Sequence, residues 1–566
     1  MNSRRSVLSN TLALLGMGAS ASRATGAATV VAAPSGIPYP RTAAESASNV
    51  VPADYQYAVG DVRRYGLVAN RPEAAAGNAR GLAALLAPTG AFAGNIWFPN
   101  DTGSDVYYFD DVIAVHDDVH VDLQGCTLEF SKAATKTDSN CGFLSALRNF
   151  SIQNGTIVVK YDMAGIASSA GSAIHIGNRG SDSSHFAPTY DSLLTSPMGN
   201  VTIRNVRIRS GVAKGIGIEM TGGLVGVVIQ NVWIDGQGAL AGGIYYEFGW
   251  ATPGQTDLRQ TSHAHNMRFS NICVTDLRRD MGVAISLAGA YGCLIDGLYV
   301  SGAASAFNGT PGESLFFQPW KGVDEAGAKH AIALRNVIAQ SLTGTALTFA
   351  GAQVAANGYL GKRNLGAVAQ TDLAEYSVEG FSLQGSAGGW GVYTSAAKAD
   401  IRNGRISGFQ RGIVQSNDCT RLFVNAVDVV GCSQFALQLD LGNTIWSPAR
   451  KKMGEIRNCF IAGNGTLGAG QYPAIVLDTC AGFIIEGNRI GYEPAHDGTA
   501  ETSQGHAIQV GTHSTNVICR GNYVGGVHEN CVGYCGLATD DAHGNTIESP
   551  GGIVTTRGSW RGITVK

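Results

Sequence analysis

Two glutamates carry the clearest chemistry in this sequence of 566 residues. Glu219 ends the segment Ile216–Glu219, and Glu247 ends the similar segment Ile244–Glu247. If Ile216 and Ile244 align in neighbouring strands, both glutamates face outward with their Cα atoms roughly 4.8 Å apart. Two carboxylates this close repel, so one keeps a proton near neutral pH while the other stays ionised. A protonated acid beside an ionised carboxylate can act as the general acid and the base or nucleophile that cleave a glycosidic bond.

The geometry of this pair leaves two matters open. The side chains could reach the ~5–5.5 Å separation of retaining glycosidases or the ~6.5–9.5 Å of inverting ones, so no stereochemical outcome is predicted. The alternative interpretation is a pair of solvated surface glutamates. Asp440 and Asp478, on later repeats, form a second and weaker carboxylate set.

Residue types that bind sugars gather around the two glutamates. Aromatic rings contact sugars through apolar C–H surfaces, and arginine or lysine pairs with acidic groups. A polar insertion at 251–267 carries His263 and His265, which are candidate general bases or ordinary loop histidines. Two histidines without a third ligand make no complete metal site, so no metal is expected. The predicted substrate-binding residues are Asp235, Tyr245, Trp250, Arg278, Arg279, Gln318, Trp320 and Lys321.

The elements that must position these residues repeat along the chain. Alternating apolar residues with a central Asn or Gly recur from residue 119 onward, as in Val201–Gly211 and Val227–Gly236. Most repeats hold a second short strand, such as Ala173–Ile176 or Ala474–Asp478. Two or three such strands per ~25 residues, with Gly or Asn at the corners, describe one coil of a parallel β-helix. About fourteen coils would give a rod on the order of 65 Å long.

The recurring asparagine separates this fold from two others. Asparagine at one position of each repeat favours stacked identical turns, which an antiparallel sandwich lacks. A β-propeller needs repeats of about 40 residues, which fit the spacing poorly.

The N-terminus has the features of an export signal. Residues 1–28 contain Arg4 and Arg5 in a string that resembles a twin-arginine export motif, followed by the apolar stretch Leu8–Met17. That stretch is too short to cross a bilayer as a stable helix. We predict a signal peptide at 1–28, a linker at 29–60 and a single β-helix domain at 61–566, exported to the periplasm or secreted.

The composition limits the partners. The net charge is -3 and only 15% of the residues are charged, which disfavours nucleic acid and anionic membranes as partners. The 76 glycines suit many tight turns. Most of the 11 cysteines are expected to be small buried core residues, with Cys531 and Cys535 the best guess for a disulfide.

The start of the domain resembles the N-terminal cap of the pectate-lyase-like superfamily. The matching pieces are Asp61–Gly66, a helix at 78–86 and Gly94–Pro99. Within the superfamily, pieces of this kind close the first coil of a right-handed parallel β-helix. An acidic stretch found in many members is replaced here by Ala69–Ala74. The resemblance implies a right-handed, all-β solenoid with a capping helix within 61–110, and a carbohydrate-active protein.

The superfamily's catalytic strings are mostly absent. Val232–Asp235 resembles the W-I-D-H string of pectate lyases, but Gly236 replaces the histidine, so Asp235 is expected at a repeat corner that could also line a groove. The nearest counterparts of the G-H-G and D-D strings of polygalacturonases lie out of order at 505–507 and 540–541.

The sequence therefore predicts a polysaccharide-cleaving enzyme. Hydrolysis by Glu219 and Glu247 leads. The alternative is a lyase acting on a uronate-containing polysaccharide, with His263, His265, Lys321 and the arginine pair supplying base and cation, with or without Ca²⁺. A fructan transferase and a non-catalytic glycan-binding protein are further alternatives. No other cofactor is expected, and assembly into a homotrimer is compatible with the sequence.

Overall fold

The computed structural model describes most of the chain beyond the first 38 residues. The described residues are 39–86, 94–115, 118–131, 141–145, 149–160, 171–177, 198–213, 215–221, 224–247, 249–250, 261–262, 264–310, 330–350, 374–396, 398–416, 419, 421–441, 452–491, 503–511, 514–525, 531–536, 546–548 and 556–558. Within these ranges, no helix has the length and apolar character needed to cross a membrane.

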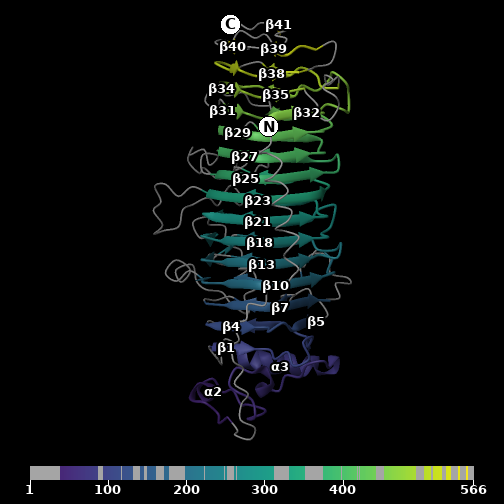
Figure 1. Cartoon of the computed structure of the whole chain (residues 1–566). Coiled ribbons are helices and arrows are strands. Elements are labelled where there is room, and N and C mark those ends of the chain that lie inside the picture. Colours follow the sequence, from purple (N-terminus) through teal and green to yellow (C-terminus); the bar gives the residue numbers. More distant parts are fainter. Residues whose placement is uncertain are drawn as a thin grey trace, which may run out of the picture.

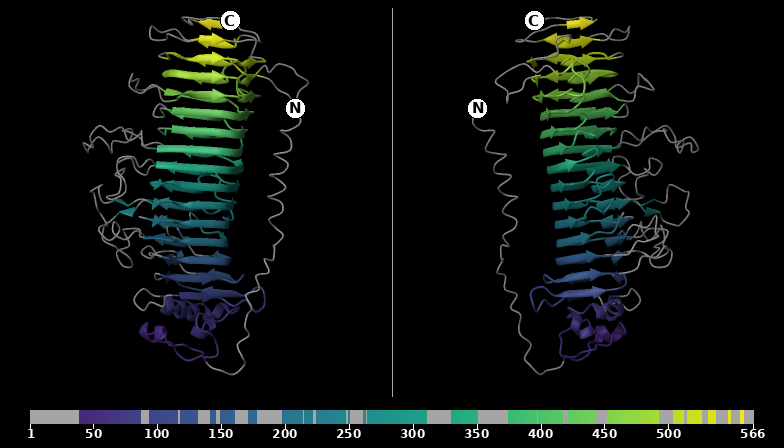
Figure 2. Two further views of the ribbon diagram at one scale, coloured as in Figure 1. Left: turned by 60° about the vertical axis from the view of Figure 1, so that its left-hand side comes forward. Right: turned by 90° about the vertical axis from the view of Figure 1, so that its right-hand side faces the viewer.

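Two long parallel sheets run the length of a rod, and within each sheet the strands stack one above the other (Figures 1 and 2). The 20-stranded sheet consists of β1 (Gly94–Trp97), β2 (Val106–Phe109), β4 (Val119–Asp122), β5 (Thr127–Phe130), β7 (Ser151–Val159), β10 (Thr202–Ser210), β13 (Val228–Asp235), β18 (Arg268–Thr275), β21 (Cys293–Ser301), β23 (His330–Leu342), β25 (Ala374–Gly385), β27 (Lys398–Ser407), β29 (Arg421–Val430), β31 (Lys452–Arg457), β32 (Phe460–Ala462), β34 (Cys480–Glu486), β35 (Arg489–Ile490), β37 (Ile518–Arg520), β38 (Tyr523–Val524) and β40 (Thr546–Glu548).

The second sheet has 15 strands, and each of them pairs in parallel with strands one coil away. They are β3 (Ile113–Val115), β6 (Cys141–Ser145), β8 (Ser172–Gly177), β11 (Ile216–Thr221), β14 (Gly242–Glu247), β19 (Val283–Ala288), β22 (Ser305–Thr310), β24 (Leu347–Phe349), β26 (Trp390–Thr394), β28 (Arg411–Ser416), β30 (Leu437–Leu441), β33 (Ile475–Leu477), β36 (Ile508–Val510), β39 (Tyr534–Gly536) and β41 (Thr556–Gly558). Two small sheets add β9 (Met198–Gly199), β12 (Leu224–Val225), β17 (Ala264–His265) and β20 (Ala290–Tyr291), and then β15 (Gly249–Trp250) with β16 (Thr261–Ser262).

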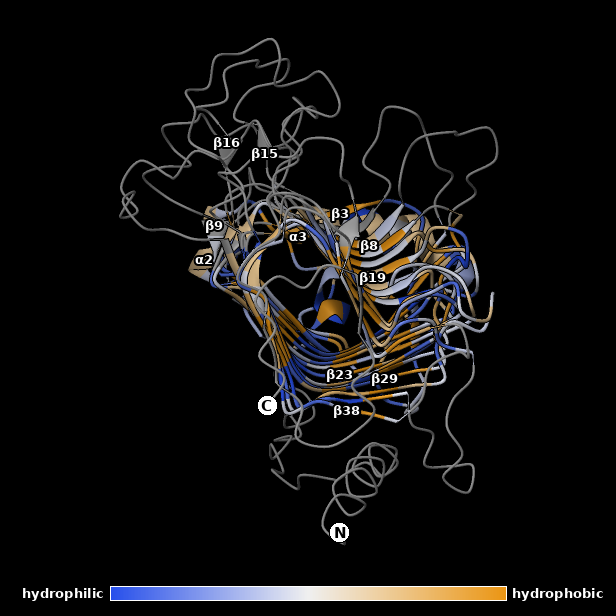
Figure 3. Cartoon of the chain, turned by 90° about the horizontal axis from the view of Figure 1, so that it is seen from above, coloured by the Kyte–Doolittle hydropathy of each residue, from blue (hydrophilic) through white to orange (hydrophobic). Residues whose placement is uncertain are grey.

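This arrangement confirms the right-handed parallel β-helix predicted from the repeats, with 15 strands in the second sheet against about fourteen expected coils. Figure 3 shows the two sheets around a common interior, seen along the rod. Buried apolar side chains of both sheets form one continuous core there. Inward and outward residues alternate along each strand, so every coil buries its apolar half only by stacking on its neighbours.

The recurring asparagines lie at a bend inside the strands of the 20-stranded sheet. Asn154, Asn205, Asn231 and Asn271 have φ between 52° and 61°, in the left-handed region that asparagine tolerates better than most residues. Their side chains form a ladder in which each Nδ2 donates to the Oδ1 of the coil below, at 3.0 Å in each of three links. The ladder confirms that this position marks stacked identical turns.

The cap closes the N-terminal end of the rod as predicted. Helix α3 (Ala75–Leu86) buries Leu82, Leu85 and Leu86 completely beneath the first coils. Short 3-10 turns at Val62–Tyr65 and Pro72–Ala74 lead into it. The side chain of Asn78 ties the helix down, because its Nδ2 donates to the carbonyl oxygens of Val68 and Tyr108.

Residues 39–60 differ from the expected linker, because they fold against the cap. They include helix α2 (Ala43–Ala47), whose Glu45 is fully buried against the fully buried Arg64. The Arg64 guanidinium donates to both carboxylate oxygens of Glu45 and to the carbonyl oxygens of Tyr39, Pro40 and Tyr57. A composition rich in Ala, Ser and Pro suggested a linker, but one buried charge pair anchors the segment.

The cysteines are core residues for the most part. All ten whose side chains are described are free thiols, and eight of them are buried. Cys531 and Cys535 are both free, so the predicted disulfide between them is wrong. Burial raises the pKa of Cys293, Cys432 and Cys459 to about 12, which keeps these thiols protonated and unreactive.

Candidate functional site

Long connections leave the rod at one edge of the 15-stranded sheet. Strands β8, β22 and β24 end at Gly177, Thr310 and Phe349, and β14 ends at Glu247. Segments 178–197, 251–260, 311–329 and 351–373, which lie outside the described residues, all follow these ends. Because the strands are parallel, the carboxyl ends from which these segments continue lie at the same edge of the sheet.

Glu219 lies in the middle of β11 on the outer side of this sheet. Its neighbours Ile218 and Met220 point inward and are completely buried, while Glu219 is half-buried. Along the rod, its Cα pairs with that of His175 on β8 and that of Tyr245 on β14. We call His175, Glu219 and Tyr245 the Glu219 row. It continues upward through Ser286 and Asn308.

The expected alignment of the two glutamates is wrong by two residues. In the structure Ile218 pairs with Ile244, and Glu247 pairs with Thr221 rather than with Glu219. This register brings two small residues together. Gly217 lies against Gly243, where a side chain on Gly217 would come within 2.8 Å of the Gly243 carbonyl oxygen and 3.0 Å of Ile234.

A signal for the correct register was present in the sequence. In coil after coil, a small residue precedes the first inward apolar residue of the 15-stranded sheet. Strand β11 begins with two such pairs, Gly215-Ile216 and Gly217-Ile218, and the expected alignment used the first. From β8 to β36 the column pairs in register as Ala173-Ile174, Gly217-Ile218, Gly243-Ile244, Ala284-Ile285, Ala306-Phe307, Ala346-Leu347, Gly391-Val392, Gly412-Ile413, Ala436-Leu437, Ala474-Ile475 and Ala507-Ile508.

The corrected register leaves the two glutamates as diagonal neighbours on one sheet. Their backbones are one coil and two residues apart, which corresponds to roughly 8 Å between Cα atoms instead of 4.8 Å. The structure describes only the backbone of Glu247. The stacked pair on equivalent rungs is therefore replaced by a wider, oblique pair.

Tyr245 completes the surface beside Glu219. Its hydroxyl donates to the Ala241 carbonyl oxygen at 3.1 Å, and its ring lies over Gly242, where any side chain would collide with it. Burial raises the pKa of Tyr245 to about 12, so the phenol stays neutral over the physiological range. A flat, neutral aromatic surface next to a carboxylate suits the apolar face of a sugar ring.

The predicted arginines lie at the other edge of this sheet. Arg278 and Arg279 precede β19, whereas the long connections follow the strands. The Arg278 Nε donates to Asp280 at 2.9 Å, and the Arg279 Nη1 donates to the Ser341 carbonyl oxygen at 3.0 Å. The structure thus does not bring this pair together with Glu219.

Asp235 lies on the 20-stranded sheet, away from the Glu219 row. It ends β13, accepts a hydrogen bond from the Gln237 backbone at 3.2 Å and lies 3.7 Å from Arg209. This geometry fits the repeat corner expected for it.

The remaining predicted residues are described in part or not at all. The backbone of His265 pairs with Val225 and Tyr291, and that of Trp250 pairs with Thr261. His263, Gln318, Trp320 and Lys321 lie outside the described residues.

Comparison with known proteins gives likeness in shape alone. No protein-family model matches the chain, and no curated protein matches it in sequence. Among solved structures, the mannuronan C-5 epimerase AlgE6 A-module of Azotobacter vinelandii matches with 12% identity and a TM-score of 0.32, over 89% of this chain and 97% of that one. At this level of likeness, neither it nor the structures below assign a reaction or a site.

Two further solved structures match at similar levels. The tailspike protein of E. coli bacteriophage HK620 in complex with pentasaccharide has 11% identity and a TM-score of 0.41, over 90% of this chain and 76% of that one. The catalytic unit of a GH87 alpha-1,3-glucanase from Streptomyces thermodiastaticus strain HF3-3 has 11% identity and a TM-score of 0.41, over 90% and 71%.

The described part of the chain offers few candidate metal ligands close together. There, no group of three or more His, Cys, Asp or Glu side chains is placed to hold a metal ion. His263, one half of the histidine pair considered from the sequence, falls outside that part.

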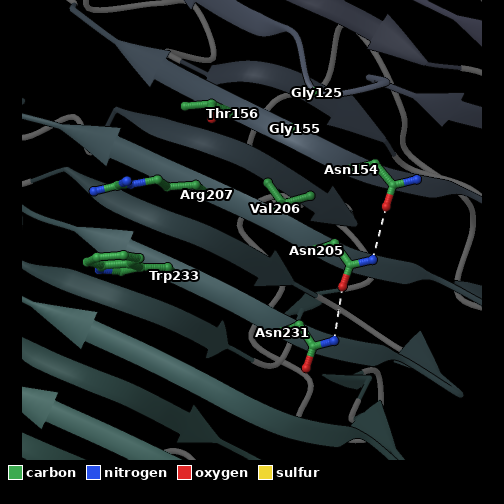
Figure 4. A pocket seen from close by; sticks show the side chains of 9 residues that line it. All are labelled: Gly125, Asn154, Gly155, Thr156, Asn205, Val206, Arg207, Asn231 and Trp233. Atoms are coloured by element: carbon green, nitrogen blue, oxygen red, sulfur yellow. Dashed lines mark hydrogen bonds between the residues drawn. The ribbon is translucent and has the colours of Figure 1, made fainter. Parts of the chain in front are cut away.

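A second surface feature was not predicted as a site. A hollow of about 410 Å³ opens on the outer face of the 20-stranded sheet, next to the asparagine ladder (Figure 4). Arg207 and Trp233 stack on its rim, with the guanidinium carbon 4.0 Å from the ring centroid. The sequence holds one signal for this pair. Arg207 and Trp233 each lie two residues after the recurring asparagine of their repeat, so aligning the asparagines would have placed the two side chains next to each other.

Proposed function

We propose that the protein is an exported enzyme that hydrolyses glycosidic bonds of a polysaccharide on the outer face of the 15-stranded sheet. The observation that carries the proposal is the Glu219 row. It sets a half-buried carboxylate between a histidine and a neutral aromatic ring, with Glu247 one coil and two residues away. The reaction class rests on these residues of the chain itself.

In this proposal one glutamate protonates the leaving oxygen while the other activates water. Glu219 is placed to act as one of the two, and Glu247 as its partner. Their Cα separation of roughly 8 Å favours the ~6.5–9.5 Å carboxyl spacing of inverting glycosidases. The Tyr245 ring would hold a sugar by its apolar face, while His175, which is buried, would support Glu219 from the neighbouring coil. Hydrolysis by such a pair needs no metal or organic cofactor.

Export and partners complete the proposal. A twin-arginine signal at 1–28 would carry the protein to the periplasm or beyond, where a polysaccharide substrate is met. Trimer formation remains a prediction that chromatography with light scattering would check.

The test incubates the mature protein with a panel of acidic and neutral polysaccharides. New reducing ends and the ultraviolet absorbance of unsaturated uronates are followed in the same samples. Reducing ends without absorbance are expected. Glu219→Gln and Glu247→Gln should each lower kcat by about 10²–10⁴-fold, the usual contribution of a general acid or base. Glu379→Gln, which alters a glutamate on the 20-stranded sheet, is the matched control and should leave kcat unchanged.

The other outcomes identify the alternatives. Absorbance that rises with the reducing ends would mean elimination, and attention would move to His263, His265, Lys321 and added Ca²⁺. Transfer products without net hydrolysis would mean a transferase. Binding without any product would mean a glycan-binding protein. If hydrolysis occurs but both Gln variants retain full kcat, the Glu219 row is not the active site.

A further inference from the structure

The hollow beside the asparagine ladder is a furrow that runs along the rod over β7, β10 and β13. One wall consists of Asn154, Asn205 and Asn231, and the other of Thr156, Arg207 and Trp233 (Figure 4). Each strand contributes one residue to each wall, because these residues are two apart and share the outer face. Val206 and the glycines Gly125 and Gly155 lie between the walls.

Arg207 is held in place but has unused capacity. Its guanidinium lies flat over the indole of Trp233, and the indole Nε1 in turn donates to Thr275 Oγ1 at 3.4 Å. Its Nε is buried and has no hydrogen-bond partner, and among the described residues no carboxylate forms an ion pair with Arg207. By contrast Arg209, two residues along the same strand, lies 3.7 Å from Asp235.

The asparagine wall also has capacity to spare. Asn205 and Asn231 are exposed, and each uses one amide hydrogen to reach the oxygen of the coil below. An amide carries two hydrogens and two acceptor lone pairs, so each rung keeps a donor and an acceptor for a ligand. The asparagine wall therefore presents the same polar groups on three successive coils, about 4.8 Å apart.

We propose that this furrow binds a stretch of an acidic glycan, with a carboxylate or sulfate on Arg207 and hydroxyl groups on the asparagine wall. The planar fork of arginine matches such anions, and its stack on Trp233 fixes the fork before binding. Trp233 is 43% exposed, which leaves its outer edge free to contact a sugar.

This site is separate from the Glu219 row, because the two lie on different sheets. A polymer held in the furrow would raise its effective concentration at the other face. The furrow would thus retain long acidic chains without taking part in bond cleavage.

The test measures binding to the full mature chain carrying Glu219→Gln, so that the probes stay intact. The probes are galacturonate oligosaccharides, chondroitin sulfate oligosaccharides and neutral maltooligosaccharides, followed by isothermal titration calorimetry. Arg207→Gln should weaken binding of a carboxylated or sulfated probe about tenfold or more, as expected for loss of charge-assisted hydrogen bonds. Arg204→Gln is the matched control, because Arg204 is exposed on the same strand but does not line the furrow.

Two further variants protect the conclusion from a folding artefact. Arg207→Lys keeps the charge but loses the fork, and should weaken binding while leaving the unfolding profile unchanged. Arg204→Gln in the chain with Glu219 intact should leave cleavage of short oligosaccharides unaffected, because Arg204 does not line the furrow. The two acidic probes distinguish a carboxylate site from a sulfate site.

Several results would overturn the proposal. These are equal weakening by Arg207→Gln and Arg204→Gln, which would reveal non-specific attraction, and equal affinity for the neutral probe. An absence of binding by the parent chain, or binding unaffected by Arg207→Gln, would do the same. None of these outcomes bears on hydrolysis at the Glu219 row, which the reducing-end assay tests alone.

Discussion

Replacing Glu45 by glutamine should detach the N-terminal segment from the cap. Burial by itself raises the pKa of Glu45, but hydrogen bonds from Arg64, Thr42 and Tyr65 outweigh it and lower the pKa from 4.5 to about 2. A shift of about 2.5 units corresponds to about 3 kcal/mol of folding stability. Glu45→Gln also leaves Arg64, which is fully buried, without its counter-charge, and breaking such a pair costs about 3–5 kcal/mol.

The pH dependence has a definite sign. Because the folded pKa lies below the unfolded one, the stabilisation is complete above about pH 4.5 and is lost as the pH falls towards 2. In the native protein, the free energy of opening of residues 42–66 should fall by about 3 kcal/mol across this window. In Glu45→Gln it should be low throughout and lack this dependence.

Hydrogen exchange read by mass spectrometry suits this measurement, because the rod need not unfold as one unit and the cap can be followed by its own peptides. Exchange rates are corrected for the intrinsic effect of pH. Glu73→Gln is the control, since Glu73 is exposed in the same cap. Equal opening energies in the two variants, or a native cap that opens independently of pH between 5 and 2, would refute the reasoning.

Three other perturbations test the interior and the register. Gly217→Ala should destabilise the coils around Glu219 and reduce activity, because the new methyl group would lie 2.8 Å from the Gly243 carbonyl oxygen. Gly77→Ala in α3 is the control, since its methyl group meets open space and should stabilise the cap slightly. Urea unfolding followed by circular dichroism compares the stabilities of the two variants. Asn205→Gly keeps the left-handed backbone and should lower the free energy of unfolding by about 1 kcal/mol, because the hydrogen bonds of the ladder are lost. Asn205→Ala should lower it further, because alanine is strained in this backbone conformation. Equal unfolding midpoints of the two variants in the same assay would contradict this. Among the described thiols only Cys273 and Cys531 are partly exposed. A thiol reagent should therefore modify these two first in the native protein, and the buried cysteines only after denaturation. Rapid labelling of the buried cysteines in the native protein would contradict their burial.

The architecture was predictable because the sequence pattern of a coil recurs many times along the chain. The alternation of apolar residues and the asparagine at one point of each coil recur along the chain, so an error in one repeat leaves the fold unchanged. The cap was predictable as well, since α3 has a continuous apolar face and follows a recognisable turn. Buried thiols followed from their apolar surroundings.

The candidate site was harder to predict, because it depends on single registers. Two Gly-Ile pairs at the start of β11 offered two alignments, and the structure adopts the one that pairs Ile218 with Ile244, in which Gly217 has no room for a side chain. The fold of residues 39–60 was missed for a related reason. It depends on Glu45 and Arg64, which are 19 positions apart and give no local pattern.

The cap has one more consequence, for how the rod ends. A stack of parallel strands exposes unpaired backbone groups at its terminus, and such an edge can accept a strand from another molecule. Helix α3 lies across the first coils and covers this edge at the N-terminal end (Figure 1). A chain whose helix α3 has come away from the first coils would therefore be at risk of joining other rods end to end and growing into fibres.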